Sequence, residues 1–367
     1  MNKPTTPPLS DYRVVHLASW GPGPYAAMLL ADMGCDVIIV DRRSEMITTV
    51  PAGQDPRRRG QRSIALDLKN ADDKDVFLEL IASADVFIEG MRPGAAERLG
   101  IGPETCLAKN SRLIYSRMTG WGQEGVLAQT AGHDINYIAL SGALHAMGDP
   151  DREPAIPLNL LGDYGGGGLF LITGILAALL EREKSGQGQV IDGAIVDGVA
   201  SLSAATLGMK AVGRWGERGT NTFDGSCPWY CCYRTQDDKF VAVGAIEEGF
   251  YRKLLEGLGL AIEDWPRDNP QAIAALKEKL TALFASNSRD HWQALFEKTD
   301  ACVTPVLDFD EAVTAGHHVS RETYGEVNGI PQPMPGPRLS RTPFRTPSSP
   351  PSPGEHSDQI LQQLKLL

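Results

Sequence analysis

The stretch RVVHLASWGPGPYAAMLLADMGCDVIIVDRR, residues 13–43, decides the fold of this chain. Its apolar start, residues 14–17, predicts a short buried strand, and residues 37–40 predict a second one. Between them, residues 25–33 predict a helix that Gly34 ends as a C-cap. We therefore expect a strand–helix–strand unit, which is the building block of a parallel sheet.

The same alternation continues along the chain. Strand-like segments at 85–89 and 113–117 alternate with helix-like segments at 74–83 and 94–99, and a long apolar helix is expected at 163–184. This order predicts an α/β fold with a large, Rossmann-like, doubly wound parallel sheet.

A second, smaller α+β domain is expected after a loop rich in Gly, Arg and Asn. We place the first part of the large domain at residues 1–219, the small domain at 220–325, and a return to the large domain at 326–367. Nine prolines stand in the 23 residues from 331 to 353, which excludes a helix or a central strand there. A disordered tail is the alternative, but the apolar spacing of the last residues favours a terminal helix that docks on the large domain.

Composition excludes several classes of protein. The 35 Lys and Arg against 46 Asp and Glu give a net charge of −11, which argues against a general nucleic-acid binder. The six cysteines contain no CxxC pair, so we expect reduced thiols and a cytoplasmic location. The apolar run at 169–180 is short for a membrane span, and residues 1–10 lack the pattern of a secretory signal, so no membrane association is expected.

Residues 21–26 match the dinucleotide-binding pattern G-x-G-x-x-A and precede a strand that ends at Asp41. A pyrophosphate at this place would be held by backbone N–H groups, and Pro22 and Pro24 remove two of those donors. Asp41 is also followed directly by Arg42. We therefore interpret the motif as a tight strand-to-helix turn.

Basic residues are concentrated in the first part of this acidic chain. Guanidinium groups bind phosphates through paired hydrogen bonds, so a group of them predicts an anion site, although each arginine alone could be ordinary surface charge. Arg92 ends a predicted strand, where α/β sheets collect ligands. The group consists of Arg42, Arg57, Arg58, Arg59, Arg62, Lys69, Arg92 and Arg98.

Three further side chains are candidates for acid–base chemistry. His133 precedes a predicted helix, Asp163 precedes the glycine run 165–168, and Glu247 ends a predicted strand. An imidazole and a carboxylate on either side of one carbon could remove a proton from one face and return one to the other. The alternatives are a structural histidine and an N-capping aspartate. The glycines imply a close approach, either of substrate or of another helix.

Other chemistries have no matching pattern. His317 and His318 are adjacent and no HxxxH spacing occurs, so no metal site is predicted. The GxSxG motif of many serine hydrolases is also missing.

At these residues the sequence resembles the α-methylacyl-CoA racemases of the family III CoA-transferase superfamily. The segments that carry the resemblance are GPGP at 21–24, VDR at 40–42, LDLK at 66–69, RPG at 92–94, MTGWGQ at 118–123, GHDINY at 132–137, PLNL at 157–160, VGAIE at 243–247 and DACVTPV at 300–306.

The resemblance implies a function. It makes His133 and Asp163 the two acid–base residues that invert C2 of a 2-methyl-branched acyl-CoA through an enolate, with Glu247 as a supporting acid. No metal or cofactor is implied beyond the CoA of the substrate, and an interlocked homodimer is expected. The residues expected to bind CoA and the acyl group are Arg42, Leu66, Asp67, Leu68, Lys69, Arg92, Arg98, Gly132, Asp134, Ile135, Asn136 and Tyr137.

Two other functions remain open at this stage. A family III CoA-transferase would use Asp163 to form a covalent acyl intermediate, although the Gly-His-Asp triplet at His133 favours the racemase. A non-catalytic acyl-CoA binder is the other. The sequence departs from the racemase pattern near the expected acyl pocket, which leaves the preferred acyl group open. The departures are Ser226, Cys227, Cys231 and Cys232.

Overall fold

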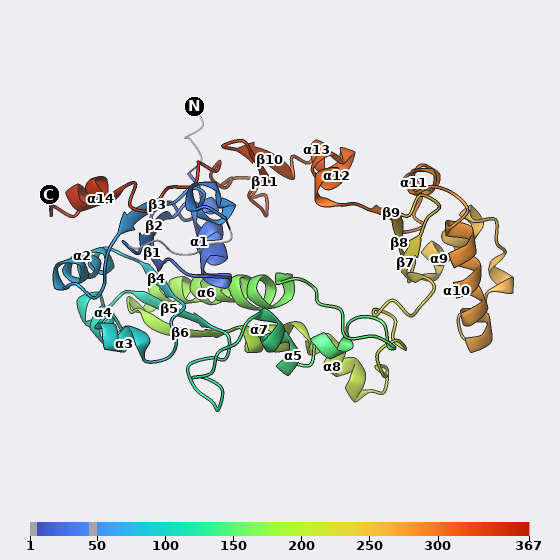
Figure 1. Cartoon of the computed structure of the whole chain (residues 1–367), viewed down its shortest axis with the longest axis horizontal. Coiled ribbons are helices and arrows are strands. Elements are labelled where there is room, and N and C mark those ends of the chain that lie inside the picture. The colour runs from blue at the N-terminus through green and yellow to red at the C-terminus, as the bar shows by residue number, and fades with distance from the viewer. Residues whose placement is uncertain (1–5, 44–49, 367) are drawn as a thin grey trace. The chain divides into compact units, whose positions relative to one another are not determined.

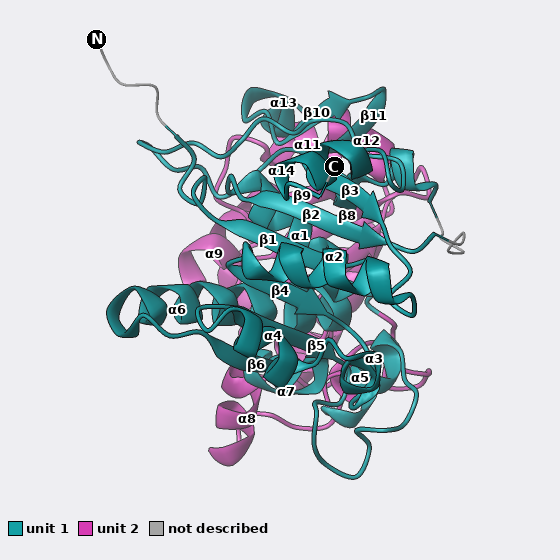
Figure 2. Cartoon of the chain, turned by 90° about the vertical axis from the view of Figure 1, so that its left-hand side faces the viewer, with its two compact units in different colours: residues 1–141, 157–202, 316–367 teal, residues 142–156, 203–315 magenta. Residues whose placement is uncertain are grey.

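The computed structural model describes residues 6–43 and 50–366 and separates the chain into two units. The first unit comprises residues 1–141, 157–202 and 316–367, and the second comprises residues 142–156 and 203–315 (Figure 2). These boundaries differ from the expected ones because residues 142–156 pair with a later loop. The guanidinium of Arg218 donates to the carbonyls of His145 at 3.2 Å and Arg152 at 2.9 Å.

A six-stranded parallel sheet forms the centre of the first unit (Figure 1). Its strand order, β3-β2-β1-β4-β5-β6, is the doubly wound order, so the predicted α/β class is confirmed. In such a sheet, ligands bind at the carboxyl ends of the strands. The strands are β1 (Arg13–Leu17), β2 (Asp36–Asp41), β3 (Arg62–Ala65), β4 (Val86–Glu89), β5 (Ile114–Thr119) and β6 (Gln189–Ala194).

Helices cover both faces of this sheet. On one face α1 packs on β1 and β2, and α6 packs on β5 and β6. On the other face α2, α4 and the last helix, α14, bury one apolar core that includes Phe77, Phe87 and Ile360. The helices are α1 (Pro22–Asp32), α2 (Ala71–Ala82), α3 (Ala95–Leu99), α4 (Pro103–Lys109), α5 (Asp134–Leu140), the π-helix η4 (Leu160–Leu169), α6 (Phe170–Ser185), α7 (Ile195–Leu202), α13 (Gly316–Ser320) and α14 (Ser357–Gln363).

The proline-rich return is ordered by polar contacts with the sheet domain. Strands β10 (Tyr324–Val327) and β11 (Ile330–Pro333) form a separate antiparallel pair. Beyond them, Arg345 donates to the carbonyls of Gly34 and Cys35, the latter at 3.4 Å. The backbone N–H of His356 then donates to the carbonyl of Ser63 at 2.9 Å, which places α14 beside β3.

The second unit has its own core around a three-stranded antiparallel sheet of order β7-β8-β9. Aromatic side chains dominate this core, with Tyr233 stacked on Phe284 at 4.9 Å between ring centroids. The elements are β7 (Tyr230–Arg234), β8 (Phe240–Gly244), β9 (Val303–Val306), α8 (Ala204–Ala211), α9 (Glu248–Gly257), α10 (Pro270–Phe284), α11 (Arg289–Phe296) and α12 (Phe309–Thr314).

Candidate active site

His133 lies exposed at the start of helix α5. Its backbone N–H donates to Oδ1 of Asn136 at 3.0 Å, which closes the first turn. The preceding loop is held by Tyr137, whose hydroxyl donates to the carbonyl of Gly132. A side chain at position 132 would meet the Tyr137 ring at 2.7 Å, so the glycine is required for this packing. Gly132, Asn136 and Tyr137 therefore orient the histidine.

Asp163 lies in the first turn of the π-helix η4, where a continuous α-helix over 163–184 was expected. That expectation is wrong for residues 163–169, and Asp163 is not a helix N-cap either, since Asn159 holds that position. A π-helix is rare and commonly marks a functional site, because its wider turn displaces side chains from their α-helical direction.

The glycine run allows η4 to pack closely against two neighbouring helices. A Cβ atom at Gly166 would lie 2.6 Å from a side-chain carbon of Val199 in α7, and one at Gly168 would lie 2.6 Å from the ring of Tyr25 in α1. Of the two close approaches considered from the sequence, helix packing is therefore the one that accounts for these glycines.

The carboxylate of Asp163 is placed between η4 and the start of α1. Nδ2 of Asn159 donates to its Oδ2 at 3.2 Å. A Cβ at Gly21, the N-cap of α1 with φ of 65°, would lie 2.9 Å from the same oxygen. The Asp163 carboxylate thus lies at the N-terminus of α1, where a dinucleotide-binding motif would hold a pyrophosphate. A negative charge at this place is consistent with interpreting residues 21–26 as a turn.

Burial is the main cause of the raised pKa of Asp163. The hydrogen bond from Asn159 opposes this effect, the charge of Asp134 adds to it, and the charges of His133 and Arg57 oppose it. Because the charge of His133 contributes to the pKa of Asp163, the two side chains lie within electrostatic reach of each other. A carboxylate with a raised pKa is a stronger proton acceptor than an ordinary aspartate.

Asp134 joins the two candidate groups. Its Oδ1 accepts a hydrogen bond from the backbone N–H of Asp163 at 2.6 Å, and the backbone N–H of Gly162 also points to this carboxylate. Because Asp134 follows His133 directly, this contact fixes the start of α5 against the start of η4. One oxygen of its carboxylate is therefore used within the protein, whereas Oδ2 is buried and has no hydrogen-bond partner among the described residues.

The predicted CoA-binding residues of the β2 and β3 edge lie in two environments. Arg42 and Lys69 are exposed, whereas Leu66 is buried in the core and Leu68 packs against it. Asp67 accepts a hydrogen bond at 3.0 Å from the backbone N–H of Lys69. The cations of this edge are therefore available to a ligand, and Leu66 could contribute only through its backbone.

Arg92 and Arg98 are exposed beyond strand β4, which β1 separates from β2. The loop that carries Arg92 is held by Glu89, whose Oε2 accepts from the backbone N–H of Met91 at 2.6 Å. Burial and the charge of Asp163 raise the pKa of Tyr137, and the charge of Arg92 partly opposes this effect. The loop before α3 therefore lies within electrostatic reach of α5.

Four arginines at 57–62 were expected to contribute to an anion site together with the other basic residues, and in the structure these four form ion pairs within the protein. Each member is paired with a carboxylate of the protein, so its charge is already neutralised. Arg58 and Arg59 are also buried, at 8 % and 2 % exposure. The pairs are Arg57 with Asp55, Arg58 with Asp41, Arg59 with Asp32 and Arg62 with Asp36.

Glu247 lies in the second unit, at the junction of β8 and α9. Its side chain is exposed and does not cap its own helix. Ser226, Cys227, Cys231 and Cys232 belong to the same unit, and Ser226 Oγ donates to the carbonyl of Asn221 at 2.6 Å.

Asn159 is the functional residue that sequence reasoning missed. It belongs to the segment at 157–160 that carried part of the resemblance, but no role was assigned to it. Its separation of four residues from Asp163 is the signal that could have placed both on one side of a helix.

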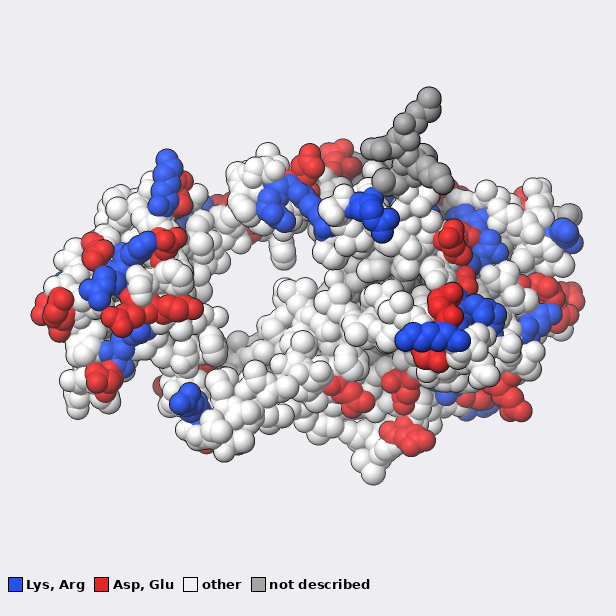
Figure 3. Space-filling model, turned by 180° about the vertical axis from the view of Figure 1, so that it is seen from behind, with Lys and Arg blue, Asp and Glu red and all other residues white. Residues whose placement is uncertain are grey.

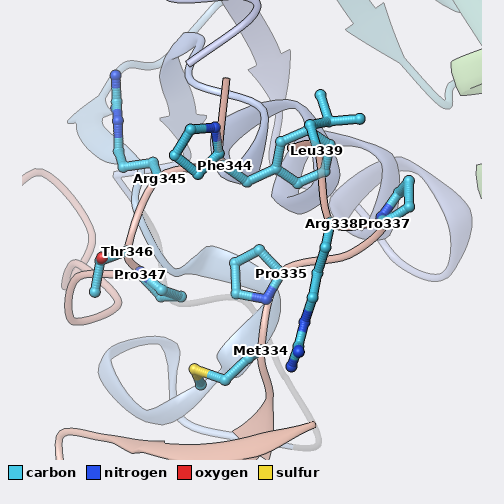
Figure 4. A pocket seen from close by; sticks show the side chains of 10 residues that line it. Met334, Pro335, Pro337, Arg338, Leu339, Phe344, Arg345, Thr346 and Pro347 are labelled. Carbon is cyan, nitrogen blue, oxygen red and sulfur yellow. The ribbon is translucent and has the colours of Figure 1, made fainter. Parts of the chain in front are cut away.

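A cavity of about 320 Å³ in the proline-rich return is lined by Pro335, Leu339, Phe344 and neighbouring residues, and none of its lining residues is a His, Asp or Glu (Figure 4). Within residues 6–43 and 50–366, no three His, Cys, Asp or Glu side chains gather as metal ligands.

The doubly wound parallel sheet makes this chain an α/β protein, and His133 and Asp163 are its candidate acid–base groups. Comparison with known proteins identifies the family. CoA-transferase family III matches residues 9–357, so the chain belongs to this family, and the resemblance seen in the sequence is confirmed.

Two racemases and one solved structure show how extensive the similarity is. The chain is 45 % identical over 360 residues to the α-methylacyl-CoA racemase of Mus musculus and 41 % identical over 369 residues to that of Homo sapiens, each covering 97 % of this chain and 93 % of the relative. A CAIB/BAIF family protein from Brucella suis superposes with a TM-score of 0.84 at 26 % identity, covering 98 % of this chain and all of that one.

Proposed function

We propose that this protein is an α-methylacyl-CoA racemase, an isomerase that inverts the C2 stereocentre of 2-methyl-branched acyl-CoA thioesters. The observation that carries the proposal is that a hydrogen bond between Asp134 and the backbone of Asp163 holds the segments of His133 and Asp163 together. Two chemically different acid–base groups stand at the starts of adjacent helices, joined through the contact of Asp134 with the backbone of Asp163. The similarity to two racemases over 97 % of the chain supports the same function.

The chemistry needs two proton-transfer groups. One group removes the C2 proton, the negative charge passes to the thioester oxygen as an enolate, and the other group returns a proton to the opposite face. Which of His133 and Asp163 acts first depends on the configuration of the substrate. Asn159, through its hydrogen bond to Oδ2 of Asp163, holds this carboxylate in one orientation. We propose no metal or separate cofactor for these steps.

Incubation of a 2-methylacyl-CoA in D₂O tests the proposal against the alternatives. A racemase incorporates deuterium at C2 and inverts the centre without a second substrate. A CoA-transferase exchanges no C2 proton and needs an acid acceptor for the CoA. A non-catalytic binder does neither, so either of the last two results would refute the racemase.

We propose that Arg42 and Lys69 bind the phosphates and adenosine of CoA, with Arg92 and Arg98 beside them. They are exposed cations at the carboxyl edge of the sheet in a chain of net charge −11. On the face seen in Figure 3, basic and acidic side chains are interspersed, unlike the continuous basic surface of a nucleic-acid-binding protein.

Replacement of Arg42 by alanine should weaken the binding of free CoA about tenfold at low ionic strength, because a charge-assisted hydrogen bond to a phosphate is lost. The difference should shrink as salt rises, since exposed charges are screened. Arg112→Ala, at the opposite edge of the sheet, is the matched control. Equal CoA affinity of the wild type and Arg42→Ala by calorimetry at low salt would remove Arg42 from the site.

We propose that a second copy of the chain covers the apolar surface of η4 and α6. The helical stretch 160–185 is long and apolar enough by composition to cross a membrane, and 44 % of its most apolar part is buried in the structure. Its helix ends in charged residues, and it also packs on the sheet, as a core helix does. Large apolar side chains exposed in this region are Leu140, Leu158, Leu160, Leu169, Phe170, Leu180 and Leu202.

The resulting homodimer should sediment at twice the chain mass of 39.6 kDa at micromolar concentration, and the protein should not float with lipid vesicles. In the interlocked arrangement, the small unit of one copy would bring Glu247 to the His133 and Asp163 of its partner. A monomer in sedimentation, or flotation with vesicles, would contradict the dimer. We also propose a cytoplasmic location, which the six free cysteines support.

A further inference from the structure

The backbone on the amino-terminal side of Glu247 is held by a side chain from a distant loop. Nη1 of Arg267 donates a hydrogen bond to the carbonyl oxygen of Ile246. This residue comes directly before Glu247, at the end of β8, where the chain turns into α9. Arg267 lies in the irregular segment before α10, 20 positions after Glu247. Nothing in the local sequence around Glu247 predicts this contact.

The guanidinium of Arg267 is itself fixed by two aromatic rings. It lies 5.3 Å from the ring centroid of Trp229 and 4.8 Å from that of Tyr251, in the range of cation–π attraction. The two rings meet edge to face with their centroids 5.6 Å apart, and both are buried. The Tyr251 hydroxyl donates to the carbonyl of Trp265 at 2.8 Å, which ties the loop of Arg267 to the same group.

The same aromatic residues hold the backbone on either side of Glu247. The N–H of Ala245 donates to the carbonyl of Trp229 at 2.8 Å, and the N–H of Tyr251 donates to the carbonyl of Glu247 at 2.9 Å. We call Arg267, Trp229 and Tyr251 the clamp. It restrains the residues before and after Glu247 and the carbonyl of Glu247 itself.

The side chain of Glu247, in contrast, is left available. It is exposed, and among the residues that the structure describes no hydrogen bond or ion pair to its carboxylate is found. It lies close enough to Cys302 to add to the raised pKa of that thiol, of which burial is the larger cause. A rigid backbone beneath an unpaired, exposed carboxylate is the arrangement expected when the position of that carboxylate matters outside its own unit.

We infer that Arg267 is a positioning residue that sets the location of the Glu247 carboxylate for proton transfer, by donating to the Ile246 carbonyl from a guanidinium that the Trp229 and Tyr251 rings hold in place. This inference rests on the proposed racemase function and deepens it. Arg267 touches neither substrate nor the reacting carbon, and acts only through Glu247.

A double-mutant cycle tests the inference in the full-length protein. Arg267→Ala should lower kcat for C2 exchange by up to about 10²-fold with little change in KM, because a small displacement of a catalytic group has an effect of this size. Glu247→Gln should also be slow, and the double variant Arg267→Ala/Glu247→Gln should be no slower than Glu247→Gln alone. Arg267→Lys, which keeps a cation and a donor, should recover part of the rate.

Arg252→Ala is the matched control, since this arginine lies on α9 and forms only an exposed ion pair with Glu248. It should match the wild type in kcat. Multiplicative rate losses in the double variant, or a loss in KM alone, would overturn the positioning role. A general folding defect caused by Arg267→Ala would instead lower the melting temperature. It would also slow the Glu247→Gln variant further.

Failure of the proposed function can be distinguished from failure of the clamp. A wild-type protein that exchanges no C2 proton refutes the racemase, and backbone hydrogen exchange then decides about the clamp. Faster exchange of the amides of residues 247–251 in Arg267→Ala, but not in Arg252→Ala, supports the clamp. Unchanged protection in Arg267→Ala overturns it, whatever the reaction is.

Discussion

His133→Ala should abolish racemisation in both directions while one substrate enantiomer still exchanges its C2 proton with solvent. Every inversion needs one acid and one base, so loss of either group stops it. Asp163 could still remove and return a proton on its own face, and this gives slow exchange without inversion. Removal of a general acid or base typically costs about 10²- to 10⁴-fold.

Asp163→Asn should show the opposite enantiomer preference, because the surviving His133 serves the other face. The measurement is deuterium incorporation at C2 of each enantiomer, by mass spectrometry, together with chiral analysis of the product. Circular dichroism and melting should match the wild type in both variants. If both enantiomers exchange at wild-type rates in either folded variant, the two-base assignment is refuted.

Asp32→Asn should destabilise the first unit by about 3–5 kcal/mol, because it leaves the guanidinium of Arg59 buried without its counter-charge. The two side chains are only 4 % and 2 % exposed and are joined by two hydrogen bonds of 3.0 and 2.6 Å. Arg59→Met should cost less, since burial already raises the pKa of Asp32 and the carboxyl group can take up a proton. The free energy of unfolding in urea measures both.

Asp32→Asn should also loosen the proline-rich return. Arg59 Nη1 also donates to Oε1 of Gln332 at 2.9 Å and to the carbonyl of Pro333 at 2.6 Å, so it connects α1 to β11. Limited proteolysis should cut the return faster in Asp32→Asn than in the wild type. Glu79→Gln, which breaks an exposed pair with Lys109, is the control and should cost less than about 1 kcal/mol. Equal stability of the two variants would contradict the role of burial.

The sequence by itself determined the fold class and the family. Hydrophobic runs of strand and helix length alternate from residue 13 onward, and each predicts its element locally because periodicity depends on near neighbours along the chain. Residue type and position likewise identified His133 and Asp163 as candidates, and Pro22 and Pro24 lie at the start of α1, where each removes a backbone donor.

Only the tertiary structure decided which charged groups are free to act. The arginine run and Arg42 look alike in sequence, yet Arg59 is neutralised by Asp32, 27 positions earlier, while Arg42 stays exposed. The need for glycine in η4 comes in the same way from how closely α1 and α7 pack against it. Asp134 and Arg267 acquire their roles from backbone groups 29 and 21 positions away, and composition and spacing carry no information about such pairings because chain separation does not determine distance in a folded protein.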